Sequence, residues 1–227
     1  MLEGSDGPKS RRGLTAAVTD ELRAAILGGA LAAGTQLRQD HIAAAQGVSH
    51  IPVREALRRL EAEGLVTHYP RRGVFVARLS GAEAWELTEM RMALEGLAVR
   101  LSLARAGGAD FEAAQAALES GDRSASLDDW SAANWAFHRA LYAPAGRPRL
   151  LKSIEGLWGQ VDRYLRVVWQ TADYQDRSQS EHWDILGAYR RGDATWAAEL
   201  IAAHVDDAGK VLQRFMEQAE SAEDETR

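Results

Sequence analysis

The chain has 227 residues and is moderately acidic, with 27 Lys and Arg against 33 Asp and Glu and a net charge of −6. That length is enough for one large domain or two small ones. The absence of cysteine excludes disulfides, thiolate catalysis and cysteine-ligated zinc, so a metal site would have to use His, Asp, Glu or Asn. No apolar stretch is long enough for a membrane helix and residues 1–12 lack an apolar signal segment, so we expect a cytoplasmic protein without membrane partners.

Charge is distributed unevenly along the chain. Residues 1–78 hold 11 Lys and Arg against 8 Asp and Glu, a net +3, whereas residues 79–227 hold 16 against 25, a net −9. All seven tryptophans fall in the second part. This asymmetry predicts a basic domain followed by an acidic one. The acidic total therefore does not exclude a nucleic-acid-binding protein.

The basic part predicts three helices and a hairpin. Residues 1–12 are small and polar, which is typical of a disordered tail. Three segments with apolar residues at three- and four-residue spacing follow, and each ends at a glycine. After Gly64 the pattern alternates every second residue on both sides of a basic tip at Arg71 and Arg72, which predicts a β-hairpin. This order is that of a winged helix-turn-helix over residues 13–78.

From Gly81 onward the sequence predicts helices separated by short loops, most of them at Gly or Pro. The expected helices cover residues 81–106, 110–120, 127–143, 148–170, 176–191 and 193–218. They predict an all-α antiparallel bundle whose interior can hold a site, so the fold class is mainly α. The expected divisions are a disordered tail (1–12), a winged helix-turn-helix domain (13–78), a linker (79–82), a helical domain (83–218) and an acidic tail (219–227).

The strongest functional signal lies between Gly47 and Val66. A glycine turn, Ser49 as the N-cap of a helix, and Arg54 and Arg58 along that helix are typical of a recognition helix, which enters the major groove and meets phosphates with its cations. The alternative is a solvated helix face whose arginines pair with neighbouring glutamates. Spacing alone leaves both interpretations open.

Three segments carry a resemblance to a known family. Residues 53–57 (VREAL), 60–66 (LEAEGLV) and 72–76 (RGVFV) resemble the DNA-binding domain of GntR-family transcriptional regulators. The helical remainder resembles the FCD ligand-sensing domain of the FadR branch of that family. The resemblance implies a regulator, more often a repressor, that binds an inverted-repeat operator in double-stranded DNA as a homodimer.

The same resemblance assigns roles in DNA binding to individual residues. It implies that Arg54 and the wing arginines contact DNA. His50 stands where the family usually has an arginine, so we expect a weaker and partly pH-dependent contact there. The expected DNA-binding residues are Ser49, His50, Arg54, Arg58, Arg71 and Arg72.

Three histidines of the second part lie on three different expected helices, at His138, His182 and His204, and Asn134 shares a helix face with His138. Such a set is typical of a divalent-metal site, although a single helix histidine is more often a core or surface residue. Residues 135–141 (WAFHRAL) resemble the metal-binding motif of FCD domains, in which the later histidines match further ligands and Asn134 replaces the usual Asp. The resemblance implies a four-residue ligand set for zinc, with nickel, manganese or iron as alternatives.

An open metal site also fits a metal-dependent enzyme with an accessory N-terminal module. Hydrolytic sites add a carboxylate base near the metal-bound water. Glu181 adjoins His182, but neighbouring side chains on a helix point about 100° apart, and no other acid is clearly placed to serve. We therefore expect no enzymatic activity. A metal-free FCD regulator with histidines in its core remains a second alternative.

In the family such a metal anchors a small carboxylate effector, and a cationic side chain neutralises its far end. Arg91 lies among apolar residues where FCD domains commonly place an inward arginine, so it is the first candidate for effector binding. The alternative is an ion pair with Glu95, four residues further on. Arg163 is a weaker second candidate.

Overall fold

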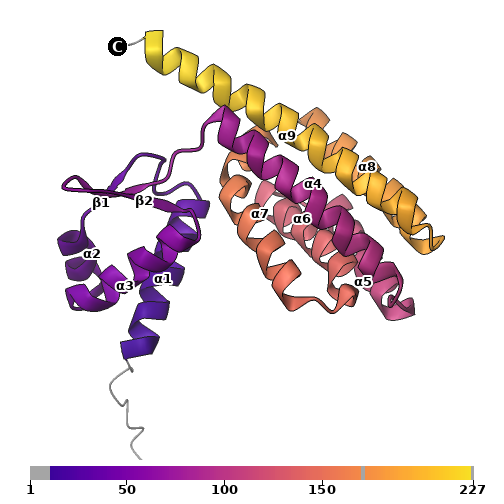
Figure 1. Ribbon diagram of the computed structural model, residues 1–227, viewed down its shortest axis with the longest axis horizontal. Coiled ribbons are helices and arrows are strands. Elements are labelled where there is room, and N and C mark those ends of the chain that lie inside the picture. Colours follow the sequence, from indigo (N-terminus) through magenta and orange to yellow (C-terminus); the bar gives the residue numbers. More distant parts are fainter. Residues whose placement is uncertain (1–10, 170–171, 226–227) are drawn as a thin grey trace, which may run out of the picture. The chain divides into compact units, whose positions relative to one another are not determined.

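A computed structural model describes residues 11–169 and 172–225 (Figure 1). The chain divides into two compact units, Met1–Arg78 and Leu79–Arg227. Among the described residues, no helix is both long and apolar enough to cross a membrane.

The N-terminal unit is a winged helix-turn-helix fold. Its elements are α1 (Arg11–Leu27), β1 (Gln36–Leu37), α2 (Gln39–Gln46), α3 (His50–Ala62), β2 (Val66–Tyr69) and β3 (Gly73–Val76). The described strands form an antiparallel sheet in the order β1–β3–β2. Apolar residues of the three helices and the sheet form one core, among them Ile26, Val53, Leu60 and Val76.

The predicted hairpin is present, but the sheet has a further strand that the sequence analysis missed. In β1, Gln36 lies opposite Phe75 and Leu37 opposite Val74. Two residues are too few for an alternating pattern to be recognised in the sequence. The Gln36 side-chain amide donates a 2.8 Å hydrogen bond to the Arg72 carbonyl, so β1 also supports the turn between β2 and β3.

The turn between α2 and α3 follows the sequence pattern. Gly47 ends α2 with a left-handed φ of 62°, a conformation that costs glycine little. Ser49 has the extended backbone of an N-cap residue, but its hydroxyl makes no capping hydrogen bond to α3. Ser49 and the first two residues of α3, His50 and Ile51, are exposed.

The C-terminal unit is a helical bundle. Its elements are α4 (Gly81–Leu103), α5 (Gly108–Asp122), α6 (Leu127–Tyr142), the short 3₁₀ helix η1 (Ala143–Ala145), α7 (Pro148–Val168), α8 (Ala172–Arg190) and α9 (Ala194–Glu225). Helix α4 begins at Gly81 as the helical pattern predicted, with Ser80 and Glu83 forming a capping box, although the expected linker extended to residue 82. Other bounds of the bundle helices differ from the expected ones by a few residues, and α9 continues well beyond Gln218. In the N-terminal unit, α1 begins at Arg11, inside the expected disordered tail.

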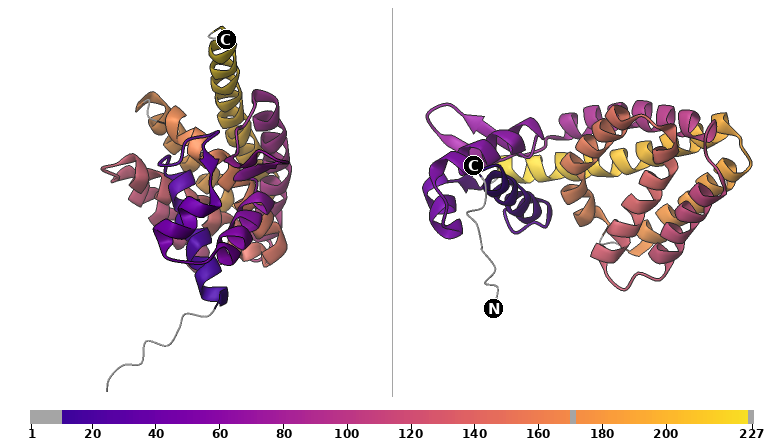
Figure 2. Two further views of the ribbon diagram at one scale, coloured as in Figure 1. Left: turned by 90° about the vertical axis from the view of Figure 1, so that its left-hand side faces the viewer. Right: turned by 90° about the horizontal axis from the view of Figure 1, so that it is seen from below.

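Helices α4 and α9 run side by side along much of the bundle (Figures 1 and 2). Gly209 on α9 faces Thr88 on α4, where an added Cβ would lie only 2.2 Å from the threonine side chain. The missing side chain therefore lets the two helices approach closely. This contact brings α4, which carries the buried Arg91 and Glu95, close to α9, which carries the buried His204.

Candidate metal centre and nucleic-acid interface

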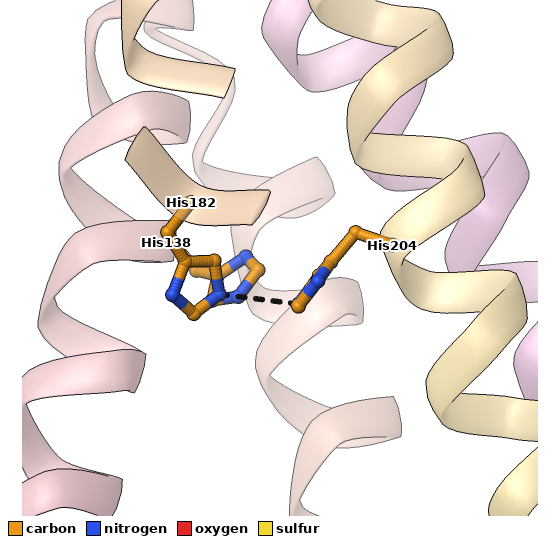
Figure 3. A group of neighbouring side chains, drawn as sticks. All are labelled: His138, His182 and His204. Carbon is orange, nitrogen blue, oxygen red and sulfur yellow. Dashed lines mark hydrogen bonds between the residues drawn. The ribbon is translucent and has the colours of Figure 1, made fainter. Parts of the chain in front are cut away.

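A histidine cluster joins helices that are distant in sequence. His138 lies on α6, His182 on α8 and His204 on α9, and all three side chains are buried. One ring nitrogen from each lies within 4.8 Å of the others. Figure 3 shows the three imidazoles close together, with a hydrogen bond joining two of them. The structure thus brings together the histidines that the sequence singled out.

The spacing within the cluster suits a metal ion. The Nε2 atoms of His182 and His204 lie 3.1 Å apart. Two imidazole nitrogens bound to one ion at about 2.0–2.1 Å lie about 2.9–3.4 Å apart for octahedral to tetrahedral angles. Their present separation therefore needs little adjustment to hold one cation.

Several buried polar atoms of the cluster lack a hydrogen-bond partner. Within the described residues, the unsatisfied buried side-chain atoms are Asn134 Oδ1, His138 Nε2, His182 Nδ1 and Trp169 Nε1. Burying a polar atom without a partner costs about 1–3 kcal/mol, so such atoms are rare in folded proteins. Three of these four atoms belong to the expected ligand residues, and a cation would give Asn134 and His138 the partner that they lack.

A tyrosine fixes the orientation of His138. The Tyr142 hydroxyl lies 2.6 Å from Glu95 Oε2 and 2.9 Å from His138 Nδ1. A carboxylate only accepts hydrogen bonds, so the hydroxyl donates to Glu95 and its oxygen accepts from Nδ1–H of His138. His138 Nε2 then carries a lone pair and no hydrogen, which is the form that binds metal.

Glu181 has the same effect on another histidine. Its Oε2 lies 2.8 Å from His204 Nδ1, while the opposite ring nitrogen faces His182. Nδ1–H of His204 donates to the carboxylate, so Nε2 points into the cluster with a lone pair. Glu181 therefore orients His204 and does not act as the free base that an enzyme would need. Metal-binding histidines usually have such carboxylate partners.

Burial lowers the pKa of His138 and of His182 well below the ordinary histidine range, and the neighbouring His204 adds to both shifts. Both rings are therefore neutral at physiological pH. Neutral imidazole is the form that coordinates a metal, so no proton has to be removed from a charged ring before binding.

Arg91 is buried beside this cluster, and the structure combines the two roles considered for it. Its Nε lies 2.8 Å from Glu95 Oε1, with both side chains buried, and its guanidinium stacks 4.6 Å from the ring centroid of Trp158. Arg91 thus points inward and is also paired with Glu95. The other effector candidate, Arg163, lies on α7, but its side chain is outside the described residues.

In the N-terminal unit, residues of α1 bind Glu55 of α3 and Glu63, the residue that caps the end of this helix. Arg23 makes a bidentate contact with Glu63 at 2.7 and 2.8 Å, and Thr15 donates a hydrogen bond to Glu55. Within the described chain, Arg54 and Arg58 are exposed and form no ion pair. The solvated-face alternative paired the arginines of this helix with the neighbouring glutamates, and the described residues show no such ion pair for Arg54 or Arg58. Both arginines are open to phosphates or bases.

The wing presents an arginine in a strained conformation. The Arg72 amide donates to the Tyr69 carbonyl at 3.0 Å, which closes a turn with Pro70 and Arg71 at its centre. Arg71 has φ of 64°, the position where glycine is favoured in a type II turn. A left-handed conformation costs a non-glycine residue about 1–2 kcal/mol. Residues kept in such conformations concentrate at functional sites.

The neighbouring Arg72 is held by two aromatic rings. Its guanidinium lies 5.8 Å from the ring centroid of Tyr69 and 5.9 Å from that of Phe75, and the two rings pack edge to face. Both wing arginines are exposed. The hairpin therefore projects two cations, one from the turn and one from an aromatic platform, which is suited to contact with a nucleic-acid backbone.

His50 is also exposed, in the first turn of α3. Its Nδ1 lies 3.5 Å from the Asp40 carboxylate of α2. The position points outward beside Ser49, as a DNA contact requires. The adjacent carboxylate would repel a phosphate. No local sequence pattern indicates this contact, because it joins two different helices.

Some residues of the cluster were missed in the sequence. Tyr142 follows His138 by four residues, so helical spacing alone could have identified it as a partner on the same face. Glu95 was considered only as the partner of Arg91. Its contact with Tyr142 spans 47 positions of the chain, and no local pattern indicates such a contact.

Comparisons with known proteins agree with this architecture. A family model described as "Bacterial regulatory proteins, gntR family" matches residues 14–76, and one described as "FCD domain" matches residues 86–207. The chain is 32% identical over 178 residues to the HTH-type transcriptional repressor GlaR of Escherichia coli (strain K12), covering 73% of this chain and 80% of GlaR.

A further relative and a solved structure extend the comparison. Over 202 residues the chain is 32% identical to the "Probable D-xylose utilization operon transcriptional repressor" of Paenarthrobacter nicotinovorans, covering 86% and 87% of the two chains. The structure of E. coli McbR/YncC has a TM-score of 0.75 at 24% identity, covering 88% and 97% of the two chains, and this likeness concerns the fold. With its winged helix-turn-helix and FCD domains in the FadR-type arrangement, the chain belongs to the GntR family of bacterial transcriptional regulators, which are DNA-binding proteins and not enzymes.

Proposed function

We propose that this regulator is a repressor that binds an inverted-repeat operator as a homodimer and senses a small carboxylate through a metal held in its FCD domain. The histidine cluster carries this proposal, because its three buried side chains each bring a ring nitrogen within 4.8 Å of the others. Tyr142 orients the ring of His138 and Glu181 that of His204. The names of the two relatives, both described as repressors, support the same direction of regulation here.

The metal ligands in this proposal are Asn134, His138, His182 and His204. The unsatisfied oxygen of Asn134 and the unsatisfied Nε2 of His138 fit a cation, and so does the 3.1 Å separation of the other two Nε2 atoms. His182 then carries its proton on Nδ1. Three imidazoles and an amide oxygen favour zinc, with nickel, manganese or iron as alternatives. When bound, the metal supplies positive charge and open positions for a carboxylate ligand.

Arg91 receives the far end of the effector in this proposal. A buried guanidinium facing a second anionic group would hold it through charge-assisted hydrogen bonds. Glu95 already occupies Arg91 at 2.8 Å, so the effector has to share or displace this carboxylate. Arg163 remains a second candidate for the same role.

On the DNA side, the proposed contacts are Ser49, His50, Arg54, Arg58, Arg71 and Arg72. The first turn of α3 enters the major groove, and the wing contacts the adjacent backbone. Effector binding changes the arrangement of the two DNA-reading heads in the dimer, so the protein no longer matches both half-sites.

The DNA part is tested by fluorescence anisotropy with an inverted repeat taken from upstream of the regulator's own gene. We expect specific binding that weakens steeply with salt and is released by the effector. Arg54→Ala should reduce affinity for that site, whereas Lys152→Ala, an exposed change on α7, should not. Equal binding to an unrelated duplex would contradict the proposal.

The metal part is tested by elemental analysis of protein purified without chelators, together with thermal unfolding before and after zinc or nickel addition. We expect about one ion per chain and a higher unfolding temperature in its presence. His138→Ala should abolish both effects. The matched control is His68→Ala, which alters an exposed histidine of β2. A metal-free protein with no thermal response would instead support a regulator whose histidines are core residues.

A further inference from the structure

Helices α8 and α9 form a hairpin that carries a pocket on its outer surface. The pocket has a volume of about 330 Å³. This volume is at the low end of the range for small-molecule sites, so it suits a ligand of few atoms. The lining residues come from α8, the turn after it and α9, and they are Trp183, Asp184, Gly187, Arg191, Trp196 and Leu200.

Two tryptophans of this pocket have open faces. Trp183 is 36% exposed and Trp196 is 47% exposed. Within the part of the chain that the structure describes, neither indole packs against another aromatic ring or a cation. The face of an indole carries negative potential and attracts cations more strongly than the other aromatic side chains do. The two rings therefore offer a surface suited to a cationic group.

The pocket is built on a fixed turn. Gly192, with φ of 74°, lies between α8 and α9. The Asp193 carboxylate accepts a 3.0 Å hydrogen bond from the Trp196 backbone amide, which holds the first turn of α9. Leu200 packs against the buried core of the bundle. Because this part of the pocket is already formed, a ligand does not have to order it on binding.

A cation and an anion line the same pocket without pairing with each other. Asp184 and Arg191 are both exposed, and among the described residues neither side chain forms an ion pair. Arg191 Nη1 lies 3.4 Å from the point where a Cβ on Gly187 would be, so the guanidinium extends back along α8. Asp184 lies three residues before Gly187, on the same face of the helix. The opposite charges therefore lie on neighbouring turns of one pocket wall.

These charges restrict the ligand that the pocket can hold. A ligand with only a carboxylate would be repelled by Asp184, and one with only an ammonium group would be repelled by Arg191. A zwitterion complements both side chains. The open indole faces favour a cation surrounded by methyl groups, as quaternary ammonium ligands in aromatic cages show.

We propose that this pocket is a second ligand site, which binds a small zwitterion carrying a quaternary ammonium group and a carboxylate. Trp183 and Trp196 contact the methylated cation beside Asp184, and Arg191 binds the carboxylate. The site is distinct from the histidine cluster. His182 precedes Trp183 but is fully buried, and neighbouring side chains on a helix point about 100° apart.

The test is isothermal titration calorimetry of the full-length protein with glycine betaine as the probe. We expect saturable binding with a dissociation constant of about 1 mM or lower. Two analogues separate the parts of the ligand. The probe 3,3-dimethylbutyrate keeps the shape and the carboxylate but has no positive charge, and choline keeps the cation but has no carboxylate. Each should bind at least about tenfold more weakly than glycine betaine.

Variants locate the binding. Trp196→Ala should weaken glycine betaine binding about 5- to 30-fold, the range expected for a cation–π contact partly shielded from water. Asp184→Asn should weaken it about 2- to 5-fold. Glu199→Gln is the matched control, because it neutralises an exposed carboxylate of α9 that does not line the pocket, and affinity should not change. Circular dichroism verifies that each variant stays helical.

The outcomes separate this site from the proposed metal centre. His138→Ala should leave glycine betaine binding unchanged. If that variant abolished the binding, the probe would be held at the histidine cluster, which would refute the second site and leave the proposed function intact.

Two further results would overturn the inference. One is the absence of saturable heat with the wild-type protein up to about 10 mM probe, or equal affinities for glycine betaine and 3,3-dimethylbutyrate. The other is loss of self-association in Trp196→Ala, measured by sedimentation equilibrium, together with no probe binding to the wild type. The pocket would then be a contact between copies of the chain.

Discussion

The Tyr142 hydroxyl donates a 2.6 Å hydrogen bond to the Glu95 carboxylate in the buried interior of the bundle. Through this bond, two residues on different helices connect the histidine cluster to the only arginine that the described structure places beside it. Glu95 holds Arg91 with its other oxygen, and Tyr142 accepts a hydrogen bond from His138. Metal binding and effector binding are therefore expected to depend on each other through these residues.

Removal of this hydroxyl tests that connection. Tyr142→Phe should lower metal affinity about 10- to 100-fold, the usual effect of losing the partner of a coordinating histidine. It also leaves Glu95 and His138 each with an unsatisfied atom, so we expect a loss of about 1–3 kcal/mol in the free energy of unfolding. Competition with a chromogenic chelator measures the affinity, and urea denaturation measures the stability.

A second tyrosine supplies the control for that prediction. Tyr189 is also buried and bonds through its hydroxyl to Ser102 and the Leu141 carbonyl, away from the histidines. Tyr189→Phe should destabilise the protein and leave metal affinity unchanged. Equal affinity losses in the two variants would mean that metal binding merely follows overall stability.

Substitution of Arg71 in the strained wing turn is expected to change stability and DNA affinity in opposite directions. At Arg71 we expect Arg71→Gly to stabilise the protein by about 0.5–1 kcal/mol, because relief of the left-handed strain exceeds the extra chain entropy of glycine. The same variant should bind operator DNA more weakly and reduce the slope of log affinity against log salt by about 1 per protomer, since one phosphate contact is lost.

A lysine at the same position distinguishes the two effects. Arg71→Lys keeps both the cation and the left-handed strain, so the salt dependence and the unfolding free energy should stay close to the wild-type values. If Arg71→Gly bound DNA as tightly as this variant, the wing would have no role in recognition.

Most of the fold could be predicted because its signals are local. Helical spacing and terminating glycines located the helices, and the period-two pattern around Arg71 located the hairpin. Strand β1 could not be found in this way, because its two residues are a strand only through their pairing with β3. The length of α9 was underestimated because an acidic composition does not by itself end a helix.

The candidate site shows the same division between local and tertiary information. His138, His182 and His204 were identified by residue type and by the resemblance. The residues that orient them were not, because Glu95 and Tyr142 are on different helices and Glu181 belongs to α8 whereas His204 belongs to α9. Hydrogen bonds of this kind depend on how helices pack, which a helical period does not encode.

The buried Tyr174 provides a test at alkaline pH. Burial raises the pKa of Tyr174 to about 12. The unfolded chain releases this proton near pH 10, so between pH 10 and 12 the folded state binds more protons and stability falls as pH rises. A shift of about two units corresponds to a loss of about 2.7 kcal/mol at this residue.

Comparison with Tyr174→Phe isolates that contribution. The variant cannot ionise, so its unfolding free energy should fall less than that of the wild type between pH 9 and 12, by about 2.7 kcal/mol at most. Urea denaturation at each pH gives the difference. Parallel pH curves for the two proteins would show that Tyr174 is not buried as described.

The histidine at the start of the recognition helix predicts that operator binding can be strengthened. His50 is exposed beside Asp40 and offers at most a single hydrogen bond to a base or phosphate. An arginine there has the planar geometry to bind both acceptors of a guanine, which is worth about 1–3 kcal/mol. His50→Arg should therefore tighten binding roughly 5- to 150-fold to operators with guanine at the contacted position.

The neighbouring carboxylate sets the control for this prediction. Asp40 would pair with the new arginine and compete with DNA for it. Asp40→Asn in the His50→Arg background should therefore tighten DNA binding further, by about 0–1 kcal/mol, which is the usual contribution of an exposed ion pair. Binding to an unrelated duplex measures the general effect of added positive charge. If both duplexes gained affinity equally, the first turn of α3 would contact only phosphates, and the specificity of this regulator would have to come from the rest of α3 and the wing.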